Sequence, residues 1–343
     1  MPPTATAPSP VSDLIAPPLE AAAEPAPQAE PAATLPRERR VSSVVKTVNL
    51  LAVVVPFVAL IVAVAVTWGW GVNWVALGAF AVMYVLTVIG VTLGYHRLFT
   101  HRSYETLTPI RATLAVLGSM AVQGPVLYWV AIHRRHHQHA DHAEDPHSPH
   151  VHPHHDHHDD HGPGVMGVLK GLWHAHAGWL LMGRPENMAR YVGDLRKDKV
   201  VRTISRLFPL WVALGLLLPA VACGLLTMSW SGALLGFLWG GLVRVFFVHH
   251  VTWSINSVCH LWGYQSFRSD DESRNNPVFG ILGLGEGWHN NHHAFPTSAR
   301  HGLRWWEVDA TYLLIRAMEA TKLAWKVRRP TADAMAAKHV SAG

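Results

Sequence analysis

Residues Gly285–Pro296 read Gly-Glu-Gly-Trp-His-Asn-Asn-His-His-Ala-Phe-Pro and carry the strongest single clue in this sequence. Three of them, His289, His292 and His293, stand at positions i, i+3 and i+4. On an α-helix this spacing places the three side chains on one face, one turn apart. Neutral imidazole is the commonest metal ligand among side chains. The stretch therefore predicts part of a metal site on a helix.

The same spacing recurs earlier in the chain. His133-Arg134-Arg135-His136-His137 repeats the triplet, His96 and His101 stand five residues apart, and His260 lies between the second and last clusters. The chain has 25 histidines, so one triplet could arise by chance. Nine histidines in four places, each beside a long apolar segment, instead predict one shared metal site.

The number of ligands narrows the kind of site. Imidazole suits iron, zinc and copper, so the residue type alone does not name the metal. Eight or nine histidines exceed the first shell of one ion, which predicts two ions. Ferritin-like di-iron bundles take a set of Glu and Glu-x-x-His ligands from four helices. The clusters here consist of histidines instead, which predicts a histidine-rich centre of two metals. His96 and His101 would lie about 140° apart on a straight α-helix, so we expect the helix to end or bend between them.

Composition predicts a polytopic membrane protein. Half of the 343 residues are hydrophobic, 15% are charged and 15 are Trp. Four apolar runs are long enough to cross a bilayer, at 45–67, 74–95, 207–228 and 232–254. The two cysteines form no CxxC pair, which argues against a disulfide framework, a cysteine zinc site and an iron–sulfur cluster. The net charge of +5 comes with no basic stripe typical of nucleic-acid binding.

The distribution of charge predicts the topology. Arg and Lys collect before the first run, after the second, before the third and after the fourth, which places both termini in the cytoplasm. A fifth apolar stretch, 110–132, is interrupted by Gln123-Gly124-Pro125. If it crossed the membrane, His101 and His133 would face opposite compartments, so we expect an interfacial or re-entrant segment. The predicted fold is all-α, with four transmembrane helices in two hairpins and a cytoplasmic helical cap that carries the histidines.

The chain divides into three predicted parts. Residues 1–40 are rich in Pro and Ala, and we expect a disordered cytoplasmic tail that is retained, because it lacks the features of a secretory signal. Residues 41–328 form the membrane domain, and 329–343 a flexible C-terminal tail. The His-rich loop 147–161 either captures metal or is a solvated insertion that binds divalent ions weakly, and we favour the insertion. Residues 165–206 suit an interfacial helical region.

Other polar residues lie near the predicted site. Asn256 is one turn before His260 on the same face, and a water-mediated role is favoured over direct ligation. His249 and His250 either join the site or form a buried polar pair that lines a cavity. Glu286 either orients a ligand histidine or marks the start of a helix. The remaining histidines outside the loop are expected to be structural or solvent-exposed; they are His174, His176, His301 and His339.

Together these motifs resemble the membrane fatty acid desaturases of the stearoyl-CoA Δ9 type. The match includes 96–104, 133–137, 256–260 and 287–296, in the same order, within residues 45–325. The resemblance implies a centre of two iron ions that uses O₂ and two electrons to introduce a cis double bond into a long-chain saturated acyl group. The implied ligands are His96, His101, His133, His136, His137, His260, His289, His292 and His293, with Asn256 bound through a water. The resemblance also places Gln123 and Trp129 near the acyl tunnel, and Asp145-Pro146-His147 in the adjoining loop.

Two departures from the acyl-CoA members concern the carrier of the acyl chain. Ala131 replaces an Arg two residues before the second histidine cluster, and Gly183-Arg184 replaces a basic pair. Arg184 remains a candidate substrate contact, and the substrate is either an acyl-CoA or a phospholipid-linked acyl chain in the bilayer. The His-Pro-Gly-Gly haem motif of fused cytochrome b5 variants is absent, so the resemblance implies a separate electron donor: a ferredoxin, a cytochrome b5-like protein or an NAD(P)H reductase.

An unactivated methylene offers no handle for acid–base chemistry, so we expect no catalytic residue beyond the metal centre. Selectivity then comes from a narrow apolar tunnel that positions one carbon and excludes water. Iron is preferred because zinc has no redox chemistry. Phe80 and Tyr84 precede His96 by three to four turns, and we hypothesise that one of them closes the tunnel. The alternatives are a hydroxylase or ketolase with a similar histidine set, and a metal transporter, which would need ligands at mid-membrane.

Overall fold

The computed structural model describes residues 42–340 except 69–72, 143, 151–163 and 183–186. The chain divides into two units, Met1–Pro36 and Arg37–Gly343, and every described residue belongs to the second. Three predictions therefore lie outside the described residues. They concern the tail 1–40, the segment 151–161 of the His-rich loop, and Arg184.

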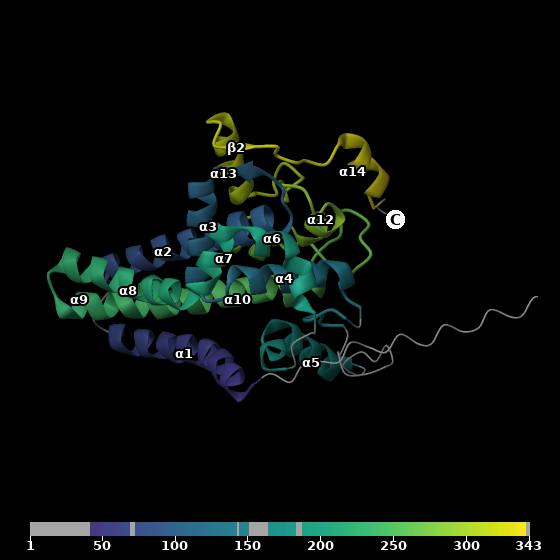
Figure 1. The fold of residues 1–343 in the computed structure, drawn as a ribbon. Coiled ribbons are helices and arrows are strands. Elements are labelled where there is room, and N and C mark those ends of the chain that lie inside the picture. Colours follow the sequence, from purple (N-terminus) through teal and green to yellow (C-terminus); the bar gives the residue numbers. More distant parts are fainter. Residues whose placement is uncertain (1–41, 69–72, 143, 151–163, 183–186, 341–343) are drawn as a thin grey trace, which may run out of the picture. The chain divides into compact units, whose positions relative to one another are not determined.

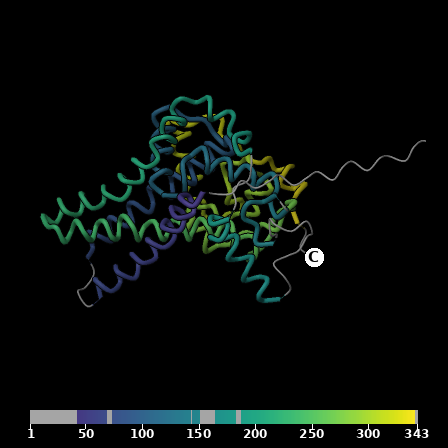
Figure 2. The backbone as a smooth tube through the Cα atoms, turned by 60° about the horizontal axis from the view of Figure 1, so that its bottom comes forward, coloured from purple at the N-terminus to yellow at the C-terminus, as the bar shows by residue number. Residues whose placement is uncertain are grey.

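Within the described ranges, four helices are long and apolar enough to cross a membrane, as the sequence predicts. They span Ser43–Thr67, Trp74–Thr100, Phe208–Thr227 and Trp230–His260. Each has at least 20 residues, which corresponds to about 30 Å of helix and matches the hydrocarbon core of a bilayer. In Figures 1 and 2 these helices extend to the same side, away from the shorter helices that form the cap.

The second and fourth spans are longer than predicted and change winding along their length. The first and third spans are the helices α1 (Ser43–Thr67) and α8 (Phe208–Thr227). The second comprises α2 (Trp74–Ile89) and the π-helix η1 (Gly90–Thr100). The fourth comprises α9 (Trp230–Leu235), the π-helix η4 (Gly236–Val243), α10 (Arg244–Ser257) and η5 (Val258–His260). The additional turns carry His96 and His260 beyond the apolar runs into the cap.

Apolar side chains cover the outer faces of these spans. Leu217 is 52% exposed and Leu226 is 75% exposed, fractions that would be costly for Leu in water. A lipid environment removes that cost, because hydrocarbon tails are as apolar as Leu. The exposure pattern thus agrees with the length and composition of the helices.

The π-helix η1 corrects our expectation for His96 and His101. The helix does not end between them but continues to Thr100, and the amide of His101 donates to the carbonyl of His96 at 3.1 Å. This i→i+5 hydrogen bond is the mark of π winding, which places residues five apart above one another. The two imidazole centroids lie 4.8 Å apart as a result.

A close approach of two backbones holds η1 in place. The helix α3 (Thr108–Met120) crosses η1 at Gly90, where a Cβ would lie 2.2 Å from the amide nitrogen of Gly118. The Tyr95 hydroxyl and the Ser119 hydroxyl form a buried hydrogen bond of 2.8 Å one turn further on. Larger side chains at this crossing would separate η1 from α3 and displace the histidines that η1 carries.

The apolar stretch 110–132 forms two helices rather than one. α3 ends at Met120 and α4 (Val126–His139) begins after Pro125, with Val122 at φ 62° and Gly124 at φ 101° in the break. Neither helix is long enough to count as a span. This arrangement leaves His101 and His133 on one side, with ring centroids 5.4 Å apart.

Short elements complete the cap around these helices. Its main core is formed by buried side chains of η1, α3, α4, α7 and α13, including Tyr95, Phe99, Val130 and Ile315. The further elements are α5 (Gly164–His176), η2 (Gly178–Leu181), η3 (Met188–Val192), α6 (Gly193–Lys197), α7 (Lys199–Arg206), α11 (Pro277–Leu282), α12 (His289–Ala294), α13 (Ala310–Ala320), α14 (Ala332–Lys338), and the strands β1 (Glu105–Thr106) and β2 (Ala324–Trp325), which pair antiparallel.

The C-terminal residues differ from the flexible tail that the sequence predicts. Residues 332–340, here called the C-terminal strap, contain α14 and then pair with the segment 266–268. The amide of Arg268 donates to Lys338 at 2.7 Å, and the amide of Val340 donates to Ser266 at 3.0 Å. The Lys338 ammonium donates to the carbonyl of Ala294, the last residue of α12, at 2.8 Å.

Candidate metal centre

The nine histidines of the four sequence motifs come together in two groups. Within each group, one ring nitrogen of every member lies within 4.8 Å of those of the others. The first group consists of His96, His101, His133, His137 and His292. The second group consists of His136, His260, His289 and His293. All are buried except His101 and His137, which are half-buried, so the groups can bind ions away from bulk water.

Each HxxHH triplet contributes to both groups. On α4, His133 and His137 belong to the first group and His136 to the second. On α12 the division is reversed, because His292 joins the first group while its neighbours at positions 289 and 293 join the second. The two helices are therefore complementary, and each contributes candidate ligands to both groups.

The nitrogen positions fit metal ions. In the first group, His96 Nε2 lies 3.0 Å and His137 Nε2 lies 2.9 Å from His292 Nε2. In the second group, His260 Nε2 lies 3.1 Å from His289 Nε2. Two nitrogens that bind one ion at about 2.1 Å and at right angles are about 3.0 Å apart. The observed separations therefore match ligands that converge on shared ions.

Unpartnered nitrogens support the same conclusion. Within the described part of the chain, the buried Nε2 atoms of His101, His136 and His293 have no hydrogen-bond partner. Buried polar atoms are rarely left without a partner, and a bound metal ion would satisfy these three. The donor set thus fits two metal ions, one in each group.

Four of the nine imidazoles contact a carboxylate through Nδ1. The Nδ1–H of His136 donates to Asp145 at 2.9 Å, and that of His260 donates to Asp141 at 2.8 Å. His293 and His96 contact Asp271 and Glu286 in the same way. Donation through Nδ1 leaves the Nε2 lone pair free for a metal and fixes the orientation of the ring. The sequence suggested this role for Glu286 alone.

These carboxylates remain ionised because the histidines oppose the effect of burial. Burial alone would raise the pKa of Asp145, but the His136 ring outweighs it and lowers the pKa to about 2. The pKa values of Asp141 and Asp271 are held well below the usual range by His260 and His293 in the same manner. Each carboxylate can therefore accept a proton-bearing nitrogen throughout the neutral range.

The two histidine groups differ in how many of their members contact a carboxylate. Among the described residues, three of the four histidines in the second group contact a carboxylate, whereas in the first group only His96 does. A carboxylate behind an imidazole increases its basicity as a ligand. The second group is therefore the more strongly electron-donating of the two.

A buried arginine neutralises the carboxylate charge next to His96. Arg97 is fully buried and donates to Glu286 at 3.1 Å and to Asp309 at 3.2 Å. The same guanidinium contacts Nδ1 of His301 at 3.1 Å. His301 is fully buried beside His292, with ring centroids 4.5 Å apart, which supports its predicted structural role.

The start of the His-rich loop belongs to the centre. His147 is buried, and its ring lies 4.5 Å from that of His136 and 5.4 Å from that of Trp179. Burial, followed by the nearby His136 ring, lowers the pKa of His147 to about 3. His150 donates to the carbonyl of His260 at 2.8 Å. Residues 147–150 therefore differ from the solvated insertion that we favoured for the whole loop.

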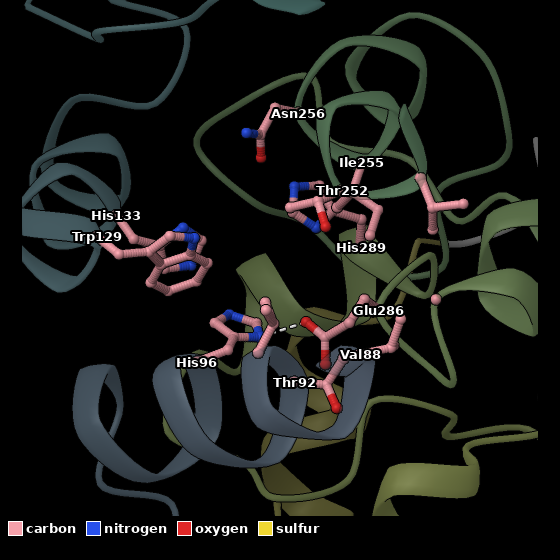
Figure 3. Close-up of a pocket in the computed structure, with 13 residues that line it drawn as sticks. Val88, Thr92, His96, Trp129, His133, Thr252, Ile255, Asn256, Glu286 and His289 are labelled. Carbon is pink, nitrogen blue, oxygen red and sulfur yellow. Dashed lines mark ion pairs between the residues drawn. The ribbon is translucent and has the colours of Figure 1, made fainter. Parts of the chain in front are cut away.

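A small hollow of about 30 Å³ touches both histidine groups (Figure 3). Its wall includes His96 and His133 from the first group and His289 from the second. Asn256 lines the same hollow, as a residue that contacts the centre through water would. Val88 and Val91 close the far side. A reacting group in this hollow would lie beside both candidate ions.

A larger hollow of about 360 Å³ leads to the small one. The two hollows share Trp129, His133, Thr252 and Asn256, and the larger one extends to Val48 of α1. At the junction, the Gln123 amide donates to Thr252 at 2.9 Å, and the Trp129 indole donates to Gln123 at 3.1 Å. The predicted tunnel residues Gln123 and Trp129 thus meet in the wall between the two hollows.

Phe80 and Tyr84 line neither hollow. Phe80 packs against Trp239 at 6.3 Å, and the Tyr84 hydroxyl donates to the carbonyl of Leu282 at 2.7 Å. The wall residue of this span nearest in sequence is Val88, one turn after Tyr84. Closure of the tunnel by Phe80 or Tyr84 stays a prediction, and such a role would require a longer cavity than the two described here.

The other flagged histidines form polar contacts outside both groups. His249 donates to the carbonyls of Ala121 and Val122 and lines the larger hollow. His250 and His176 contact each other at 2.8 Å, and His176 also contacts Ser257 at 3.0 Å. His174 is buried and His339 is exposed. His249 therefore fits the buried, cavity-lining alternative, whereas His250 is half-buried and lines neither hollow.

The family model for fatty acid desaturases matches residues 72–329, well over half of the chain. This chain belongs to the fatty acid desaturase family. Curated relatives of this desaturase agree with the match. Over 292 residues it is 43% identical to a hex-5-enoyl-[acyl-carrier protein] acetylenase from Moorena producens, covering 85% of the chain and 89% of that protein.

Two further relatives are named for different substrates. An sn-1 stearoyl-lipid 9-desaturase from Synechocystis is 38% identical over 270 residues, which is 78% of this desaturase and 76% of the relative. An acyl-CoA 5-desaturase from Anemone leveillei is 36% identical over 269 residues, or 77% and 74% of the two chains. Membership confirms the predicted resemblance and the helical membrane fold, and identifies the desaturase as an oxidoreductase of this family.

Proposed function

We propose that this protein introduces a cis double bond into a saturated long-chain acyl group at a di-iron centre. The single observation that supports this most strongly is the convergence of two histidine groups on the end of an apolar hollow. The nine histidines are the proposed ligands, and Asn256 contributes through a water. Iron is preferred to zinc because the reaction removes electrons from the substrate, and zinc has no redox chemistry.

The proposed reaction balances with an external reductant. One acyl chain loses two hydrogens, and O₂ with two electrons and two protons yields two waters. Bound iron supplies the oxidising chemistry when it is present. The electrons come from a separate donor protein, for which a ferredoxin, a cytochrome b5-like protein and an NAD(P)H reductase remain the candidates.

The chain's own residues position the substrate. The larger hollow takes the acyl chain, and the hydrogen-bonded trio of Gln123, Trp129 and Thr252 forms the wall where the chain reaches the centre. The small hollow admits one segment beside the metals and leaves little room for water. Such confinement selects one pair of hydrogens and protects the oxidant from side reactions.

The proposed regiochemistry is Δ9, with an acyl-CoA or an acyl lipid as the substrate. The relatives are named for acyl chains carried by acyl-carrier protein, lipid and CoA, so the family alone does not select a carrier. The alternative that remains is a di-iron hydroxylase, which would share the histidine set. We place both termini and the centre in the cytoplasm, on the basis of the charge pattern around the spans.

Expression in a host that lacks unsaturated fatty acids tests this proposal. Gas chromatography with mass spectrometry of the host's lipids should find a cis-9 monoene. The variant His292→Ala is the matched control, because it removes one proposed ligand of the first group. A hydroxy acid would support the alternative, and absence of any new lipid from an iron-loaded protein would overturn the proposal.

A further inference from the structure

A third hollow, also of about 360 Å³, adjoins the larger substrate hollow, with which it shares two lining residues. Arginine side chains line it from three positions, Arg196, Arg202 and Arg206. Pro125 and Tyr128 also line it, and both belong to the wall of the substrate hollow as well. A group bound beside the arginines would therefore be separated from an acyl chain in the substrate hollow only by this shared wall. We call this the arginine hollow.

The helix α7 places two of the arginines on one face. Arg202 and Arg206 stand at i and i+4 and line the hollow together with Ser205. The opposite face of α7 is fixed by Val201 and Ile204, which are buried in the main core. The position of the two guanidinium groups thus follows from the packing of α7.

The three arginines lack acidic partners, unlike their neighbours. Asp194 pairs with Arg102 and Arg134, and Asp198 pairs with Arg111. Among the described residues, no carboxylate lies within ion-pair distance of Arg196, Arg202 or Arg206. Within the same described part of the chain, Arg202 donates a long hydrogen bond of 3.4 Å to the carbonyl of Arg196.

Like charges that converge without a counter-charge favour an anion. Guanidinium groups present a planar fork of donors that matches phosphate oxygens, often with two hydrogen bonds at once. The Tyr128 and Ser205 side chains add hydroxyl groups to the same wall. The hollow therefore has the donors for a phosphate group and, among its lining residues, no acceptor that carries negative charge.

The place of the hollow relative to the membrane suits a phosphate-bearing acyl carrier. Arg206 lies two residues before Phe208, where the third candidate span begins. Phe208 itself lines the substrate hollow. A phosphate at the surface of the bilayer would thus lie beside the arginines while its acyl chain enters the hollow.

We propose that the arginine hollow binds the phosphate of the substrate's carrier and so holds the head of the substrate during desaturation. The identity of the bound molecule as substrate rests on the proposed function, whereas phosphate binding at these residues does not. The same phosphate chemistry occurs in a phospholipid headgroup and in CoA, and the experiment below distinguishes these two sources.

Equilibrium binding of stearoyl probes tests the proposal without turnover. The iron-loaded full chain is kept anaerobic in dodecyl maltoside micelles with radiolabelled stearoyl-phosphatidylglycerol, stearoyl-CoA or monostearoylglycerol, which has no phosphate. Each lost charge-assisted bond should weaken phosphate binding about tenfold in Arg202→Gln and in Arg206→Gln. The affinity of Arg202→Lys for the phosphate probes should fall between those of the wild type and Arg202→Gln, because lysine keeps the positive charge but lacks the planar fork of donors.

The control is Arg316→Gln, which removes an exposed arginine of α13 far from α7 in sequence. It should bind all three probes as the wild type does. Selective weakening of stearoyl-phosphatidylglycerol supports the site with a lipid headgroup, and selective weakening of stearoyl-CoA supports it with a soluble thioester. Unchanged binding of both phosphate probes, or equal weakening of the neutral probe, would overturn the proposal. Because no product is measured, a chain without desaturase activity still gives a result.

Discussion

Asp145→Asn should weaken metal retention while leaving the fold intact. Asp145 is 2% exposed, and its two oxygens accept from Nδ1 of His136 at 2.9 and 3.1 Å. The same oxygens accept from the amides of Asp141 and His147. An Asn side chain keeps one acceptor but turns an NH₂ group towards these donors. The His136 ring is then favoured with its proton on Nε2, the atom that should bind the metal.

The size of the effect follows from the role of the carboxylate. Loss of a group that orients a ligand costs about 10- to 100-fold in metal affinity, or about 1.4 to 2.8 kcal/mol. Competition with a chelator at rising concentration, followed by measurement of iron per polypeptide, gives this ratio directly. The midpoint of the chelator titration should shift to lower concentration in the variant.

Asp194→Asn is the matched control, since Asp194 pairs with arginines and contacts none of the nine histidines. It makes the same chemical change and should leave the chelator midpoint in place. Thermal unfolding of both metal-free variants separates lost stability from lost affinity. If Asp145→Asn retains iron as well as the wild type does, the carboxylate does not orient His136 for a metal.

Three further predictions concern pH, the C-terminal strap and the His-rich loop. Burial, followed by neighbouring rings, holds the pKa values of His133, His137, His289 and His292 well below the usual range. Below about pH 6.5 the unfolded chain therefore binds more protons than the folded one. The metal-free protein should lose up to about 1.4 kcal/mol of stability per histidine for each unit by which the pH falls. A melting temperature that is equal at pH 7.5 and pH 5.5 would contradict this. Lys338→Met should lower iron retention, because the Lys338 ammonium holds the end of α12, whereas the control Lys322→Met should not. Equal iron contents of the two variants after chelation would exclude a role for the strap. Replacement of 151–161 by a Gly/Ser linker should remove nickel-resin affinity but leave iron content near normal, because ordering a flexible loop costs about 1–2 kcal/mol per residue; loss of iron would place the loop in the site.

Helix periodicity predicted that the histidines of each triplet lie on one face, but not how the histidines divide between the two groups. The spacing of His133, His136 and His137 places them on one face of α4, as found. Which of them joins which group depends on the crossing of α4 with α12, two elements about 150 residues apart in sequence. That crossing is fixed by tertiary packing, so the spacing of neighbouring residues in the sequence cannot predict it.

Two of the four carboxylates, Asp141 and Asp271, were missed for a related reason. Asp141 and Asp271 lie in irregular segments, where no period connects them to His260 or His293. The strap was misjudged because residues 332–338 are rich in Ala and have no apolar face to bury. Its attachment relies on backbone pairing with 266–268 and on one lysine, neither of which hydropathy can detect.

The π winding of η1 gives the five-residue interval between His96 and His101 a meaning for protein engineering. Deletion of one residue in that interval, such as Leu98, would allow an α-helix with the two histidines at i and i+4, again on one face. If the remaining residues kept their π winding instead, the part before the deletion would turn relative to the part after it. His96 and Arg97 both precede Leu98, so they would turn together, away from the first group and from the carboxylates that Arg97 contacts. A graft of this centre onto another helix must therefore reproduce both the number of residues between His96 and His101 and the winding that connects them.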